Sequence, residues 1–199
     1  MDKNHVVQRH FSGDAPAGII GGPPCESFSI RGSKKGLDDE RGLLVFTFME
    51  WVSSLKPQFF LMENVPPLAK HNGGATLAKL IGIAEAAGFS VSHSIVSAAD
   101  YGSATKRRRL IVVGFLNRGP FGFPSPSHSA EPGLFQAKPY VTVKDAFRDL
   151  PEPSWKEPAS LQGHTLIKHT PEVAKRFSQL RPGQQDNIRK RTRLDLSQP

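Results

Sequence analysis

Apolar residues in the first 118 positions follow two kinds of pattern, short strand-like segments and helically spaced sets. The strand-like segments lie at 17–20, 59–62, 90–97 and 110–115. Helical spacing predicts one helix that ends before Pro57 and a second over 75–87, with Gly88 as its C-terminal stop. Because strands alternate with helices, we predict an α/β layered sheet for this part of the chain.

The first helix is expected to bury one apolar stripe, made of Leu44, Phe48, Trp51, Val52 and Leu55. After residue 118 the pattern changes, since ten of the 17 prolines lie within 120–182. Only short helices, near 143–150 and 172–180, are expected there. We therefore divide the chain into a first domain over 1–118 and a Pro-rich irregular connector over 119–199 that ends in a basic segment.

The composition is that of a folded protein, because 38% of the 199 residues are hydrophobic and 13 are Phe. The single cysteine excludes a disulfide scaffold and a multi-cysteine zinc cluster within the chain, and we expect no metal site. No apolar run approaches the ~18 residues that span a membrane, and the first residues lack the apolar segment of a signal peptide. We therefore expect a cytoplasmic protein with no membrane partner.

The net charge of +8 is unevenly distributed. Residues 1–100 carry nine Lys and Arg against ten Asp and Glu, whereas residues 101–199 carry seventeen against eight. A positive excess confined to one half of the chain favours a polyanionic partner such as nucleic acid, although a solvated basic surface explains the same charge.

Two reactive side chains follow the first two predicted strands. Cys25 comes directly after Gly21-Gly22-Pro23-Pro24, and Glu63 directly follows the segment 59–62. If these strands are parallel, both side chains lie at one edge of the sheet, where open α/β sheets bind ligands. A thiol and a carboxyl together can do nucleophilic and acid/base work. An inert buried cysteine and a structural carboxyl are the alternatives.

A basic segment precedes the last predicted strand. Alternation along its entrance places Arg107 and Arg109 on one face and Arg108 on the other. Guanidinium groups suit phosphates and base carbonyls, and a solvated basic loop is the alternative.

Four motifs, over roughly residues 17–151, resemble those of the cytosine-5 DNA methyltransferases in order and spacing. The segment 21–29, with the sequence GGPPCESFS, resembles the family's Pro-Cys nucleophile loop. Glu63-Asn64-Val65 matches its Glu-Asn-Val motif, and 99–102 with Arg107 and Arg109 resembles its Gln-x-Arg-x-Arg motif. The stretch 142–151 also has a counterpart in the family.

The resemblance implies a Rossmann-like sheet of the S-adenosylmethionine-dependent methyltransferases and methyl transfer to carbon 5 of a cytosine flipped out of double-stranded DNA. Cys25 would add to carbon 6 of the base. Glu63 would donate a hydrogen bond to N3, which requires a protonated carboxyl and hence a raised pKa. Arg109 would bind the base O2, with Arg107 supporting the same polar pocket.

The resemblance also assigns binding residues. Pro24 and Leu44 match positions that touch S-adenosylmethionine, and Ser29, Arg41 and Asn64 are candidate substrate contacts. The family's N-terminal glycine-rich cofactor loop, its target-recognition region and its closing motifs have no counterpart here. We therefore expect an incomplete sheet, with most of the cofactor pocket outside this chain.

Three functions remain open at this point. The first is a cytosine-5 DNA methyltransferase that a complementing chain or further sequence completes. The second is a non-catalytic fragment whose basic half binds DNA. The third is a tRNA cytosine-5 methyltransferase, because RNA-acting relatives share the Pro-Pro-Cys and Glu-Asn-Val motifs.

Overall fold

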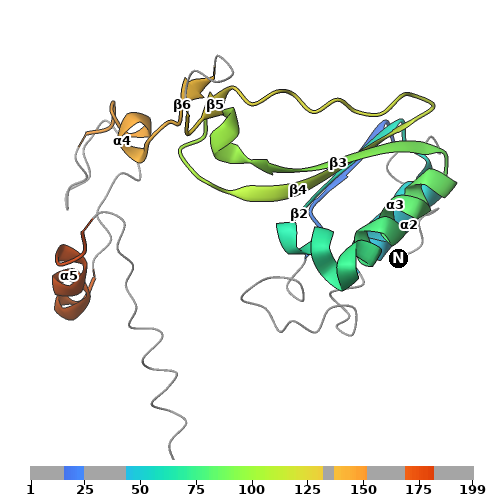
Figure 1. Cartoon of the computed structure of the whole chain (residues 1–199). Helices are drawn as coiled ribbons and strands as arrows, with labels where there is room; N and C mark the ends of the chain where they lie inside the picture. Colours follow the sequence, from blue (N-terminus) through green and yellow to red (C-terminus); the bar gives the residue numbers. More distant parts are fainter. Residues whose placement is uncertain (1–15, 25–43, 132–136, 152–168, 182–199) are drawn as a thin grey trace, which may run out of the picture. The chain divides into compact units, whose positions relative to one another are not determined.

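A computed structural model describes residues 16–24, 44–131, 137–151 and 169–181 (Figure 1). The chain divides into two compact units, residues 1–148 and residues 149–199. The second unit contributes one described helix, α5 (Pro171–Ser178), where the sequence predicts a short helix near 172–180. Within the described residues, no helix is both long and apolar enough to cross a membrane.

The first unit is built on a four-stranded mixed sheet. Its strands are β1 (Gly18–Gly21), β2 (Phe59–Asn64), β3 (Phe89–Ser97) and β4 (Arg108–Leu116). They lie in the order β1-β2-β4-β3, with β1 parallel to β2 and β4 antiparallel to both β2 and β3. All four predicted strands are confirmed, and β1 and β2 have the relative direction on which the predicted site depends.

Two helices, α2 (Leu44–Leu55) and α3 (Ala75–Ala86), lie side by side on one face of the sheet (Figure 1). The core between them and the sheet includes Val45, Met49, Val52, Leu77, Leu80, Phe60, Met62, Leu110 and Val112. Gly88, just after α3, has a φ of 99°, which a residue without a Cβ adopts readily. The predicted helix stop is therefore confirmed.

The buried stripe of α2 differs from the prediction. Of the five expected residues only Val52 is fully buried, and Val45 and Met49 fill the rest of the interface. Leu44, Phe48, Trp51 and Leu55 line an open hollow beside β1, and Phe48 also packs against the core. Apolar residues cover two adjacent faces of α2, so spacing alone could not tell which face meets the sheet.

Shorter elements follow the sheet. A 3-10 helix, η5 (Ala98–Tyr101), joins β3 to the basic segment before β4. Two-residue strands β5 (His128–Ser129) and β6 (Lys138–Pro139) then pair in parallel. The helix α4 (Val143–Ala146) is shorter than the expected 143–150, and the Thr142 and Asp145 side chains cap it reciprocally.

Gly114, in β4, leaves room for the ring of Phe60 to lie directly against that strand. The Phe60 ring packs edge-on against Phe89, with ring centroids 5.3 Å apart, and against Phe48 at 6.4 Å. A Cβ at position 114 would overlap the Phe60 ring. A side chain at this position would therefore displace Phe60 from both aromatic neighbours.

We expect Gly114→Ala to lower the free energy of unfolding by about 1–3 kcal/mol, because the added methyl group overpacks the core. Urea denaturation measures this. Gly82→Ala is the matched control, since Gly82 lies within α3 with nothing within 4 Å of its Cβ position. There alanine should stabilise the helix, by up to about 1 kcal/mol. Equal stability of Gly114→Ala and the unaltered chain would contradict the packing described here.

The cap of α4 should be sensitive to acid. Hydrogen bonds from the Thr142 hydroxyl and backbone, with a further one from Arg148, lower the pKa of Asp145 from 3.8 to about 2. Because the folded state lowers this pKa, the capping contribution is full above pH 3.8 and is lost as the pH falls through about 2. Carbon-13 NMR of the Asp145 carboxyl should show this midpoint, and Thr142→Val should raise it. A midpoint near 3.8 in the unaltered chain would contradict the cap.

Candidate active site

The carboxyl ends of β1 and β2 meet at one edge of the sheet. Gly21 pairs with Met62, so the next residues along each strand are Gly22 and Glu63. A Cβ built on Gly22 would lie 3.4 Å from Glu63 Oε2, which places the Glu63 carboxylate beside the exit of β1. The segment that continues toward Cys25 therefore passes this carboxylate. Cys25 itself, Ser29 and Arg41 lie outside the described residues.

Asn64 connects the ends of these two strands. Its side chain is only 2% exposed. The amide Nδ2 donates to the Pro23 carbonyl at 3.3 Å, and Oδ1 accepts from the Val65 N–H at 2.8 Å. Both polar atoms of the amide are therefore hydrogen-bonded to backbone groups, and the bond to Pro23 fixes the segment that leads to Cys25. This positioning role of Asn64 was not predicted from the sequence; an asparagine at a strand end, ahead of Val-Pro-Pro, was the available signal.

Two arginines from β4 and its entrance reach the same carboxylate. The Arg109 Nε–H donates to Glu63 Oε1 at 2.5 Å, and Arg107 Nη2 lies 3.9 Å from that oxygen. The antiparallel register places Ile111 opposite Glu63, and alternation puts Arg109 and Arg107 on the Ile111 side of the strand. The arrangement of the two arginines on one face is thus as the sequence predicts.

The three charged groups are exposed to different degrees. Arg109 is the most buried, at 23% exposure, followed by Glu63 at 39% and Arg107 at 60%. Arg109 Nη1 also donates to the Arg108 carbonyl at 2.7 Å, which fixes its guanidinium plane. Glu63 and Arg109 therefore form an ordered pair, and Arg107 reaches solvent at its rim. Such a cluster can form hydrogen bonds with neighbouring atoms on one polar edge of a ligand, such as N3 and O2 of a pyrimidine.

Pro24 and Leu44, the expected cofactor contacts, lie at one hollow. It runs along β1 and the adjacent face of α2 and is lined mainly by apolar groups, including Pro23, Phe48 and Trp51. Leu44 is 39% exposed in it. This surface suits the apolar part of a ligand, and no charged side chain lines it within the part of the chain that the structure describes.

No group of three or more potential metal ligands occurs among the described residues. Glu63, Arg107 and Arg109 supply hydrogen bonding and charge stabilisation at this edge of the sheet, next to a strand exit that leads to a cysteine. Phosphate or a base edge would suit the arginines better than an apolar ligand would.

The chain is similar to several bacterial Type II methyltransferases. It is 32% identical to the Type II methyltransferase M1.HphI of Haemophilus parahaemolyticus, over 88% of this chain and 45% of that protein. It is 38% identical to the Type II methyltransferase M.AquIA of a Picosynechococcus strain, over 67% of this chain and 60% of that protein. The chain thus spans about half the length of these relatives.

A solved structure with the same fold is that of a prophage-encoded DNA modification methyltransferase from E. coli. It matches with a TM-score of 0.54 and 30% identity, over 80% of this chain and 44% of that one. The fold is therefore that of the S-adenosylmethionine-dependent methyltransferases, with an incomplete sheet, as expected from the sequence. The family model for C-5 cytosine-specific DNA methylases matches residues 1–194, and the chain belongs to this family.

Proposed function

We propose that this chain supplies the catalytic groups of a DNA cytosine-5 methyltransferase. The observation that carries the proposal is the Glu63 carboxylate at the carboxyl end of β2, in contact with Arg109 and next to the exit of β1. The substrate is a cytosine in double-stranded DNA that is turned out of the helix, because carbon 6 is inaccessible in a stacked base.

In the proposed mechanism the Cys25 thiolate adds to carbon 6 of the base and makes carbon 5 nucleophilic. Glu63, in its protonated form, donates a hydrogen bond to N3 while the Arg109 guanidinium donates to O2, so the negative charge that develops on the ring is stabilised in place. Arg107 adds positive charge at the rim of the same pocket. S-adenosylmethionine supplies an electrophilic methyl group when bound. Loss of the carbon-5 proton then expels Cys25 and restores the ring.

The described residues account for part of a cofactor site. Pro24 and Leu44 lie at the hollow beside β1, which suits the apolar portion of S-adenosylmethionine. Its charged amino-acid portion needs charged partners, and none of the described residues that line the hollow carries a charge. We propose that further protein, in a complementing chain or in additional sequence, provides them. The share of the relatives that this chain spans supports the same proposal.

Covalent capture tests the nucleophile. We expect the full chain to form a denaturation-resistant adduct with duplexes that carry a 2-pyrimidinone in place of cytosine, because a thiol adds to carbon 6 of this base without methyl transfer. The base is placed opposite a mismatch, which lowers the cost of turning it out, and the flanking bases are randomised. Gel electrophoresis measures the adduct.

Cys25→Ser is the control for capture, and its adduct should be lost. An equal yield from Cys25→Ser would refute the nucleophile. Salt-sensitive DNA binding without any adduct would favour the non-catalytic fragment instead.

The role of Glu63 predicts a rate effect. Glu63→Gln should slow capture at saturating DNA by about 10²-fold, because a positioned acid/base group typically contributes ~10²–10⁴-fold. Its effect on DNA affinity should be small, since the residue acts on the base during addition. Glu85→Gln is the matched control, because Glu85 lies exposed on α3. Equal rates for Glu63→Gln and Glu85→Gln would rule out the proposed role.

A further inference from the structure

A hydrogen bond between distant parts of the first unit lies next to the arginine segment, residues 102–109, which leads from η5 into β4 and carries Arg107 and Arg109. The Tyr140 hydroxyl, directly after β6, donates to Asp100 Oδ1 at 2.7 Å, across 40 positions of sequence. Asp100 belongs to η5, which ends where the segment leading to Arg107 begins. The acceptor, the nearby negative charge and burial together raise the pKa of Tyr140 above 10.0, so the phenol remains a donor at physiological pH.

Backbone contacts join the same two regions. The Ser127 N–H donates to the Asp100 carbonyl at 2.9 Å, and the Lys138 N–H donates to the Ser127 carbonyl at 2.9 Å. The neighbouring Tyr101 hydroxyl donates to the Pro124 carbonyl at 2.9 Å. The residues of 124–140 that the structure describes are therefore attached to η5 at several points. The Tyr140 to Asp100 bond is the one made by two side chains.

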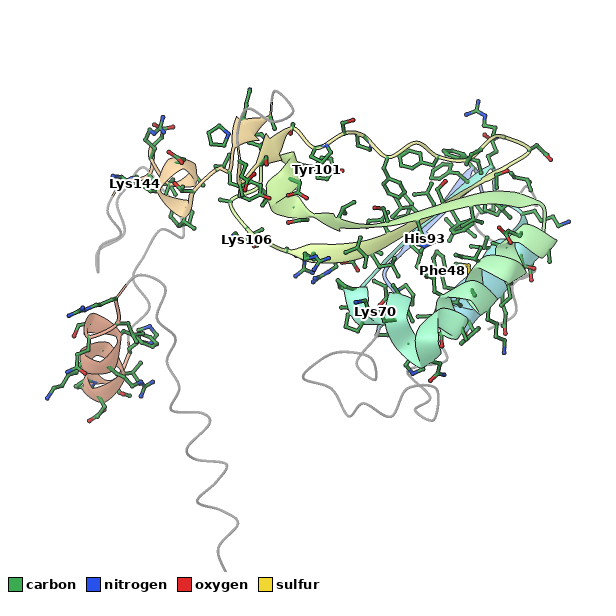
Figure 2. All side chains as sticks on the ribbon, in the orientation of Figure 1. Phe48, Lys70, His93, Tyr101, Lys106 and Lys144 are labelled. Carbon is green, nitrogen blue, oxygen red and sulfur yellow. The ribbon has the colours of Figure 1, made fainter. Side chains whose placement is uncertain are left out.

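η5 in turn holds the arginine segment. The Ala98 N–H donates to the Arg107 carbonyl at 2.9 Å, and the Ser103 N–H donates to the Ala98 carbonyl at 3.0 Å. Arg107 precedes β4, which begins at Arg108, so strand pairing does not fix it as it fixes Arg109. In Figure 2, Tyr101 and Lys106 lie at the same end of the sheet, near the two ends of the turn that joins η5 to β4.

We propose that Tyr140 is a positioning residue that acts through Asp100: it holds the turn from η5 to β4 so that the Arg107 guanidinium stays next to Glu63. The inference rests on the proposed function for its effect on catalysis. The mechanical part, a fixed turn, does not depend on it. Tyr140 and Asp100 are not part of the hydrophobic core, so removing the hydroxyl leaves no cavity there.

Hydrogen exchange of the full chain tests the mechanical part. Tyr140→Phe should accelerate exchange of the Ala98, Gly102 and Ser103 amides by about tenfold, because it removes a hydrogen bond to a charged group. Asp100→Asn keeps an acceptor oxygen but loses the charge, so it should accelerate the same amides by a smaller factor. Thr142→Val is the matched control. It removes a hydroxyl from the same segment whose partners lie within the α4 cap. Unchanged exchange in both Tyr140→Phe and Asp100→Asn would overturn the proposal.

Capture by Cys25 tests the effect on the site. Tyr140→Phe should slow capture at saturating DNA about three- to tenfold in the unaltered background and have little further effect in an Arg107→Ala background. A merely structural loss would slow both backgrounds equally, and that result would overturn the proposal. If the unaltered chain gives no adduct while exchange still accelerates, the proposed function fails and the fixed turn is supported.

Discussion

The candidate site depends on the two-sided pairing of β2. On one side β2 is parallel to β1, which brings the ends of both strands to the same edge of the sheet. On the other side it is antiparallel to β4, which brings the start of that strand to the same edge. Glu63 is therefore next to the exit of one strand and the entrance of another. A one-residue shift of β4 against β2 would turn Arg109 to the opposite surface and separate it from Glu63.

Much of this arrangement could be predicted from the sequence, because it follows from local patterns. The strands and α3 begin and end within two residues of the positions that the apolar segments and Gly88 indicate. The shared face of Arg107 and Arg109 follows from alternation along an extended chain. The meeting of Glu63 with the exit of β1 needed one assumption, that the first two strands are parallel, and the structure confirms it.

The features that could not be predicted are those that depend on tertiary contacts. The prediction of which face of α2 is buried was wrong, because contact with the sheet decides which of the two apolar stripes is buried. The amide of Asn64 bonds to Pro23, 41 positions away, and Tyr140 bonds to Asp100 across a similar separation. Neither contact leaves a periodic signal. The placement of Cys25 relative to Glu63 stays a prediction, since residues 25–43 lie outside the described part.

The prolines after β1 also limit strand pairing at the edge of β1 that faces away from β2. Among the described residues β1 pairs with β2 alone, and Ile20 is 69% exposed. Unpaired strand edges are common starting points for aggregation. Here the strand has four residues, and Pro23 and Pro24 carry no N–H with which to extend a ladder. A strand from another chain can therefore form only a few backbone hydrogen bonds with β1. This disfavours open-ended stacking of identical chains, and a stable complex at this edge would depend on side-chain packing.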